Sequence, residues 1–116
     1  MQQPKPVAGF DGYMSPKDIL DYPTLPDETV VVAHWNGKSW PDGARSIMYL
    51  TGKKNALGLR FIWNHSDVNG MKFETKDQAY GWLIQNDIYA HRSAVTTIGE
   101  LKALVGYPIG PWRRKP

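Results

Sequence analysis

The chain has 116 residues, a formal net charge of +3 and no cysteine. Its length fits a single domain, and the absence of cysteine excludes disulfide bonds and thiolate zinc sites. No apolar run approaches the roughly 20 residues of a membrane span, and no secretory signal is recognisable, so we expect a cytoplasmic protein without a membrane partner.

The first third of the chain predicts an arm, a short helix and a strand. Residues 1–12 hold two prolines and two glycines and are expected to form a flexible arm. Ser15 followed by Pro16 is typical of a helix start. The β-branched stretch at residues 29–35 predicts a strand, and Asn36-Gly37 after it is a strong signal for a tight hairpin turn.

Three further strands are predicted in the middle of the chain, at residues 45–51, 57–64 and 71–74. In the second of them every other residue is large and apolar. These side chains are therefore expected to share one face of the strand and to join the core. They are Leu57, Leu59, Phe61 and Trp63.

Two capping boxes predict helices in the last third of the chain. Thr75 followed by Gln78 predicts a helix start, because a threonine cap and a glutamine three residues later can satisfy free backbone N–H groups. Thr97 and Glu100 repeat the pattern, and Gly106 is the residue type that ends a helix.

This order of elements predicts an α+β fold. A last strand is expected at residues 89–96, between the two helices, and hairpin-type turns favour antiparallel pairing. We expect one antiparallel sheet of four to five strands, with two or three short helices packed on one face. The single domain is expected to span residues 13–106, followed by a basic C-terminal tail at residues 107–116.

Charge is unevenly distributed along the chain. Residues 1–42 carry a net charge of −3, and residues 43–116 carry +6. A basic part of this kind is typical of proteins that contact an acidic or nucleic-acid partner, and an uneven surface charge without functional meaning is the alternative.

The sequence offers little for catalysis. His34, His65 and His91 lack the spacing of metal ligands, and neither a phosphate-binding loop nor a nucleophile motif is present. Residues 67–70 match only the beginning of a calcium loop and are expected to form a plain turn. We therefore expect no catalytic activity, no metal and no cofactor.

Aromatic residues are the main candidates for binding. Five tryptophans are more large rings than a small core usually hides, so some are expected at the surface, where such rings anchor partners. Trp40, beside a Pro-Asp-Gly turn, and Trp112, near the C-terminus, are the best candidates for exposure. Basic residues complete the candidate partner-binding set: Lys53, Lys54, Arg60, Arg113 and Arg114.

Binding without catalysis is therefore the main functional hypothesis. In general character the chain resembles the small accessory proteins of phages and mobile elements, which often inhibit a host defence complex. That resemblance implies a protein partner whose surface is occupied stoichiometrically. The first alternative is a nucleic-acid-binding domain that uses the basic and aromatic residues of 43–116, and the second is a small hydrolase or nuclease.

Overall fold

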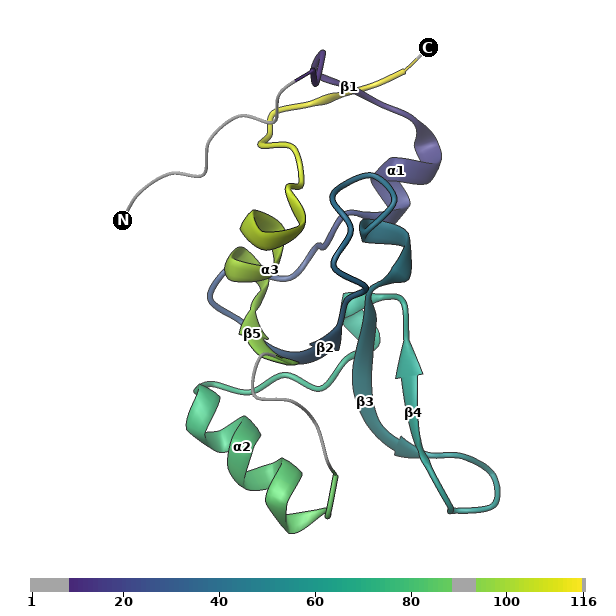
Figure 1. Cartoon of the computed structure of the whole chain (residues 1–116), viewed down its shortest axis with the longest axis vertical. Coiled ribbons are helices and arrows are strands. Elements are labelled where there is room, and N and C mark those ends of the chain that lie inside the picture. The colour runs from purple at the N-terminus through teal and green to yellow at the C-terminus, as the bar shows by residue number, and fades with distance from the viewer. Residues whose placement is uncertain (1–8, 89–93, 116) are drawn as a thin grey trace.

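The computed structural model of the chain describes residues 9–88 and 94–115 and shows a four-stranded antiparallel sheet between helices (Figure 1). The strand order is β4-β3-β2-β5, formed by Phe61–Asn64, Met48–Lys54, Val30–His34 and Val95–Thr97. The α-helices of the described residues are α1 (Pro16–Asp21), α2 (Lys76–Gln85) and α3 (Ile98–Val105). The predicted α+β class and antiparallel sheet are confirmed.

Strand β2 lies at the centre of the core because it is apolar on both faces. On one face Val31 belongs to the same buried cluster as Leu101 of α3. On the other face Val30 belongs to the cluster that contains Leu83 of α2. The two helices therefore cover opposite faces of the sheet instead of the single face that we expected. A strand without polar alternation needs apolar cover on both sides.

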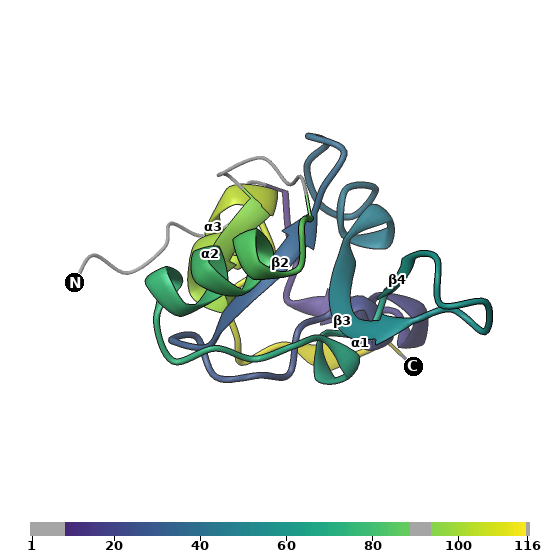
Figure 2. The same cartoon turned by 90° about the horizontal axis from the view of Figure 1, so that it is seen from below.

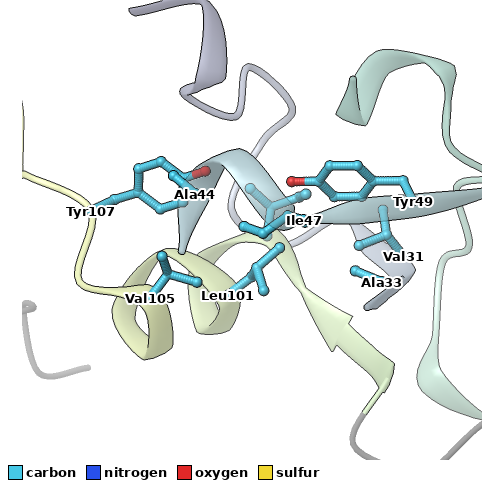
Figure 3. Packing of buried hydrophobic residues seen from close by; sticks show 9 residues of the cluster. Val31, Ala33, Ala44, Ile47, Tyr49, Leu101, Val105 and Tyr107 are labelled. Carbon is cyan, nitrogen blue, oxygen red and sulfur yellow. The ribbon is translucent and has the colours of Figure 1, made fainter. Parts of the chain in front are cut away.

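Two buried tyrosines lie in the core on the α3 side, one on either side of Ile47 (Figure 3). The Tyr107 hydroxyl donates a hydrogen bond to the backbone oxygen of Asp21, at 2.9 Å. Burial raises the pKa of the Tyr49 and Tyr107 phenols well above its usual value, and nearby negative charge adds to this effect. Both rings therefore remain neutral in the core.

The helix ends follow the predicted capping chemistry. Thr75 and Thr97 each accept the backbone N–H three residues further on, and Thr97 completes the reciprocal box. Gly106 ends α3 in the left-handed conformation, at a φ of 83°. At Thr75 only half of the expected box forms, because the Gln78 side chain accepts from the N–H of Glu74 instead. No helix in the described ranges has the length and apolar content needed to cross a bilayer.

The connection from β2 to β3 differs from the prediction. Asn36-Gly37 forms a local turn, in which the Asn36 side chain accepts the N–H of Lys38, but no tight hairpin follows. The chain instead returns to the sheet after the short 3-10 helix η1 (Ala44–Ser46), because residues 39–43 form a further hydrogen-bonded turn.

Other predicted strands have different bounds in the described structure. The segment 71–74 is reduced to a single bridge between Phe73 and Val30. Strand β5 (Val95–Thr97) contains the last two residues of the strand predicted at 89–96 and one residue beyond it, and residues 89–93 lie outside the described part of the chain.

The two ends of the described chain pair with each other. Strand β1 (Tyr13–Met14) runs parallel to β6 (Arg113–Arg114). The N–H of Arg113 donates to the backbone oxygen of Gly12 at 2.8 Å. Met14 and Pro108 are fully buried at this end of the molecule. Much of the segment predicted as a basic tail is therefore attached to the domain by backbone hydrogen bonds and packing.

Candidate interaction surfaces

The basic residues singled out from the sequence lie in two separate groups. Lys53, Lys54 and Arg60 lie on the hairpin formed by β3 and β4, and Arg113 and Arg114 form β6. In Figure 1 the hairpin is at the lower end of the molecule, whereas the C-terminus is at the upper end. The structure therefore does not bring the two groups together into one basic surface.

We call the upper group the arginine–aromatic end and define it by Tyr13, Tyr22, Trp112, Arg113 and Arg114. Its base is the β1–β6 pair, which fixes the backbone beneath the side chains. The Arg113 guanidinium lies over the Tyr13 ring, 5.6 Å from the ring centre. The Trp112 and Tyr22 ring centres are 5.4 Å apart, and Trp112 is half-buried. Tyr13 and both arginines are exposed, so this end offers rings and cations held on a defined base.

A cavity of about 230 Å³ lies beside this end, and its lining includes Tyr22, Tyr107 and Ile109. The Tyr22 hydroxyl donates to the backbone oxygen of Pro108 at 3.1 Å, so its polar atom is already satisfied. The Lys102 ammonium lies 5.0 Å from the centre of the Tyr22 ring and is paired with a carboxylate. The cavity therefore presents mainly ring and aliphatic surface at its wall.

Both ends carry cations that are not paired with acids of the described part of the chain. Within the described residues, neither arginine of β6 forms an ion pair. Several acids of the N-terminal part are engaged internally, because Arg45 pairs with Asp18, Asp21 and Asp42. An acidic partner surface would therefore meet cations whose charge is not neutralised by the protein itself.

The lower group lies around the tip of the β3–β4 hairpin, which we call the leucine tip and define as residues 53–60. Leu57 and Leu59 are 79% and 75% exposed, so the prediction that they join the core is wrong. The alternating pattern fails there because Gly58 takes a φ of 69° and residues 55–60 form a turn. The pair Asn55 and Gly58 was the sequence signal for that turn.

The remaining part of the predicted strand behaves as expected. Phe61 and Trp63 pack against the core on the α2 side. The Lys54 ammonium lies 5.4 Å from the centre of the Phe61 ring. The basic residues of the leucine tip therefore lie directly next to the part of the hairpin that packs against the core.

The tryptophans are neither fully buried nor fully exposed. All five are half-buried, so the expected surface exposure of Trp40 and Trp112 is only partial. Trp40 packs against the α3-side core, and its ring lies edge-on to Phe10 at 5.6 Å. Its indole Nε1 is buried and has no hydrogen-bond partner among the described residues. Trp40 therefore belongs to the edge of the core rather than to either basic group.

His34 and His65 contact different neighbours in the described structure. The His34 and Trp63 ring centres are 4.3 Å apart, and His65 Nδ1 lies 3.0 Å from the backbone oxygen of Ile47. His91 lies outside the described residues. Over residues 9–88 and 94–115, no group of histidine and acidic side chains has the arrangement of a metal site.

The segment 67–70, weighed above as the start of a calcium loop, forms the 3-10 helix η2 (Asp67–Asn69) and its cap. The Asp67 carboxylate is 5% exposed and accepts the N–H groups of Thr24 and Leu25, each at 2.8 Å. The carboxylate therefore connects η2 to the loop after α1, which is a structural role.

Comparisons with known proteins give no relative: no family model, curated protein or solved structure matches the chain.

Proposed function

We propose that the protein is a non-enzymatic binding module that occupies the surface of a protein partner with its arginine–aromatic end. The observation that carries the proposal is the exposed pair Arg113 and Arg114 beside Tyr13 and Trp112, on a base fixed by strand pairing. Tryptophan, tyrosine and arginine are the residue types that dominate binding energy in protein interfaces.

The fixed backbone at this end supports the same proposal. The N–H groups of Arg113 and Lys115 already donate to the backbone oxygens of Gly12 and Met14, each at 2.8 Å. A partner would therefore order few additional backbone groups, and the entropic cost of binding would be confined to side chains. The neighbouring cavity of about 230 Å³ offers room for one apolar side chain of the partner.

A nucleic-acid partner is the second candidate, because Arg113, Arg114 and Lys115 are exposed and Tyr13 could stack on a base. It is the weaker candidate because the two basic groups lie at opposite ends of the molecule (Figure 1). A nucleic-acid backbone is usually followed by a continuous basic groove. Only the end at β6 would contribute phosphate contacts.

The test is affinity capture from a lysate of the source cells, with and without nuclease, at about 150 mM and about 500 mM salt. We expect a discrete protein that is retained after nuclease and at high salt. The double variant Arg113→Glu/Arg114→Glu should lose it. The matched control Lys53→Glu/Lys54→Glu makes the same change in charge at the other end and should retain it.

If only nuclease-sensitive, salt-labile material is recovered, the partner is a nucleic acid and not a protein. A partner lost from the lysine control and retained by the arginine variant would overturn the assignment to this end. Folding of each variant is checked by its urea unfolding curve, since all four side chains are exposed and their replacement should change stability by less than about 0.5 kcal/mol.

A further inference from the structure

The leucine tip is a preformed projection. The N–H of Asn55 donates to the backbone oxygen of Arg60 at 2.8 Å, and the N–H of Gly58 donates to the oxygen of Asn55 at 2.9 Å. The Asn55 side chain also accepts the N–H of Leu59, at 3.0 Å. The turn therefore holds its two leucines outward without help from the rest of the chain. The hairpin projects from the body of the molecule in both views (Figures 1 and 2).

The exposure of these leucines has no structural explanation in the chain itself. At 79% and 75% exposed, Leu57 and Leu59 leave most of their apolar surface in water. Ile62, on β4 behind the turn, is 41% exposed as well. Burying a leucine fully gains about 2 kcal/mol, and two exposed leucines on one turn form an apolar contact surface that a singly exposed leucine does not.

The charges around the leucines have one sign. No acidic residue occurs from position 43 to position 66, whereas Lys53, Lys54 and Arg60 follow each other around the turn. In the described structure none of these three cations forms an ion pair. An anionic surface would therefore meet no repelling carboxylate from the hairpin itself.

We propose that the leucine tip docks on an anionic lipid membrane, with Leu57 and Leu59 inserted among the lipid headgroups and the three cations at the membrane surface. Leucine and lysine are under-represented in the energetically important parts of protein interfaces, but they are typical of surface-bound membrane segments. The tip has no aromatic side chain within residues 53–60 on which a nucleic-acid base could stack.

This proposal is independent of the protein partner at the arginine–aromatic end. The sequence predicts no membrane partner because it lacks a spanning segment, and no helix of the described residues could span a bilayer. A hairpin that lies on the surface needs no such segment, because apolar side chains and basic residues contribute to binding separately. Each basic residue near an anionic surface contributes about 1 kcal/mol, or roughly fivefold in affinity.

The first measurement is co-sedimentation with vesicles of phosphatidylcholine, alone or with about 30 mol% phosphatidylserine. We expect binding to the anionic vesicles that is about 100-fold tighter than binding to neutral ones, from three cations. Lys53→Gln/Lys54→Gln should weaken it by about 25-fold on the same basis. The matched control Arg113→Gln/Arg114→Gln removes the same charge at the other end and should leave binding within about threefold.

The apolar contribution is tested with Leu57→Asn/Leu59→Asn, which keeps every charge of the tip. We expect it to weaken binding by at least about 10-fold. The control Leu20→Asn/Leu104→Asn changes two other leucines, which are 86% and 61% exposed, and should bind like the natural protein. Loss of binding only in the tip variant supports insertion. If both variants bind as tightly as the natural protein, the contact is purely electrostatic and the proposal is overturned.

Insertion itself is measured with a dye, and the absence of cysteine makes this possible with a single engineered thiol. Leu57→Cys and, as the control, Leu20→Cys are labelled with an environment-sensitive fluorophore. Anionic vesicles should raise and blue-shift the emission at position 57 only. No change at position 57, or the same change at both positions, would refute docking through the leucine tip. If the natural protein does not bind vesicles and the tip variants lose a captured protein, the tip is a protein contact instead.

Discussion

The buried carboxylate of Asp67 provides the sharpest test of how the fold is held together. It accepts two backbone N–H groups, from Thr24 and Leu25, each at 2.8 Å. Asp67→Ala removes the Oδ2 atom that accepts both N–H groups and leaves two partly buried donors. A hydrogen bond to a charged group contributes about 1.5–3 kcal/mol, and the partial access of water to this loop places the total near the lower end. We expect a loss of about 3 kcal/mol in the free energy of unfolding.

Asp67→Asn separates charge from shape. Its amide oxygen can accept the same two N–H groups, but as a neutral acceptor it forms weaker bonds. We expect a loss of about 1.5 kcal/mol, roughly half of that for alanine. The control is Glu28→Ala, at an exposed carboxylate, which should change stability by less than about 0.5 kcal/mol.

The assay is urea unfolding followed by tryptophan fluorescence, with the free energy taken from the midpoint at constant slope. For a domain of this size, 3 kcal/mol corresponds to roughly 12 °C in Tm. An Asp67→Ala protein within about 1 kcal/mol of the natural one would refute the reasoning, because the loop and η2 would then be held by other contacts. Equal losses for the alanine and asparagine variants would show that the charge itself provides the stabilisation.

Further predictions concern glycine packing and pH. Gly43→Ala should destabilise by more than about 2 kcal/mol in the same unfolding assay, because an added Cβ would overlap the backbone oxygen of Lys38. Gly81 lies on helix α2 with open space around it, so Gly81→Ala should instead stabilise the fold by about 0.5–1 kcal/mol. A decrease in the free energy of unfolding would contradict a helical conformation at this position. The hydrogen bond from Lys76 lowers the pKa of Glu100, so the pair stabilises the fold above the unfolded pKa of about 4.3 and loses this effect as the pH falls through the lowered value. Lys76→Met should therefore cost about 0.5 kcal/mol at neutral pH, and in unfolding curves the difference should shrink as the pH falls below about 4.3 and vanish below the lowered pKa.

The parts of the fold that could be predicted from the sequence depend on neighbouring residues. The capping box at Thr97 and the glycine at Gly106 are local chemistry, and the structure confirms both. The β1–β6 pair could not be predicted, because two-residue strands carry almost no pattern and their partners lie about 100 positions apart. The opposite placement of α2 and α3 depends on which side of β2 each connection reaches, and periodicity does not encode that choice.

The exposure of some candidate contact residues could be predicted from the sequence, and that of others could not. The exposed cations were found by residue type, because arginine and lysine rarely lie buried. The exposure of Leu57 and Leu59 was missed, because alternation alone cannot tell where a strand ends in a turn. Trp40 was selected for its neighbouring turn, but that turn brings its ring against the core. Burial of a large ring depends on the tertiary fold, which a linear pattern does not contain.

The pairing of β1 with β6 has a consequence for the order in which the protein matures. Tyr13 has no strand partner until Arg113 has been synthesised, which at about 10 residues per second takes roughly 10 s. During that interval Met14, which ends fully buried, has no cover from β6. The arginine–aromatic end is therefore assembled after the central sheet can form, and nascent chains without the segment 107–115 would lack this surface while already containing all four strands of that sheet.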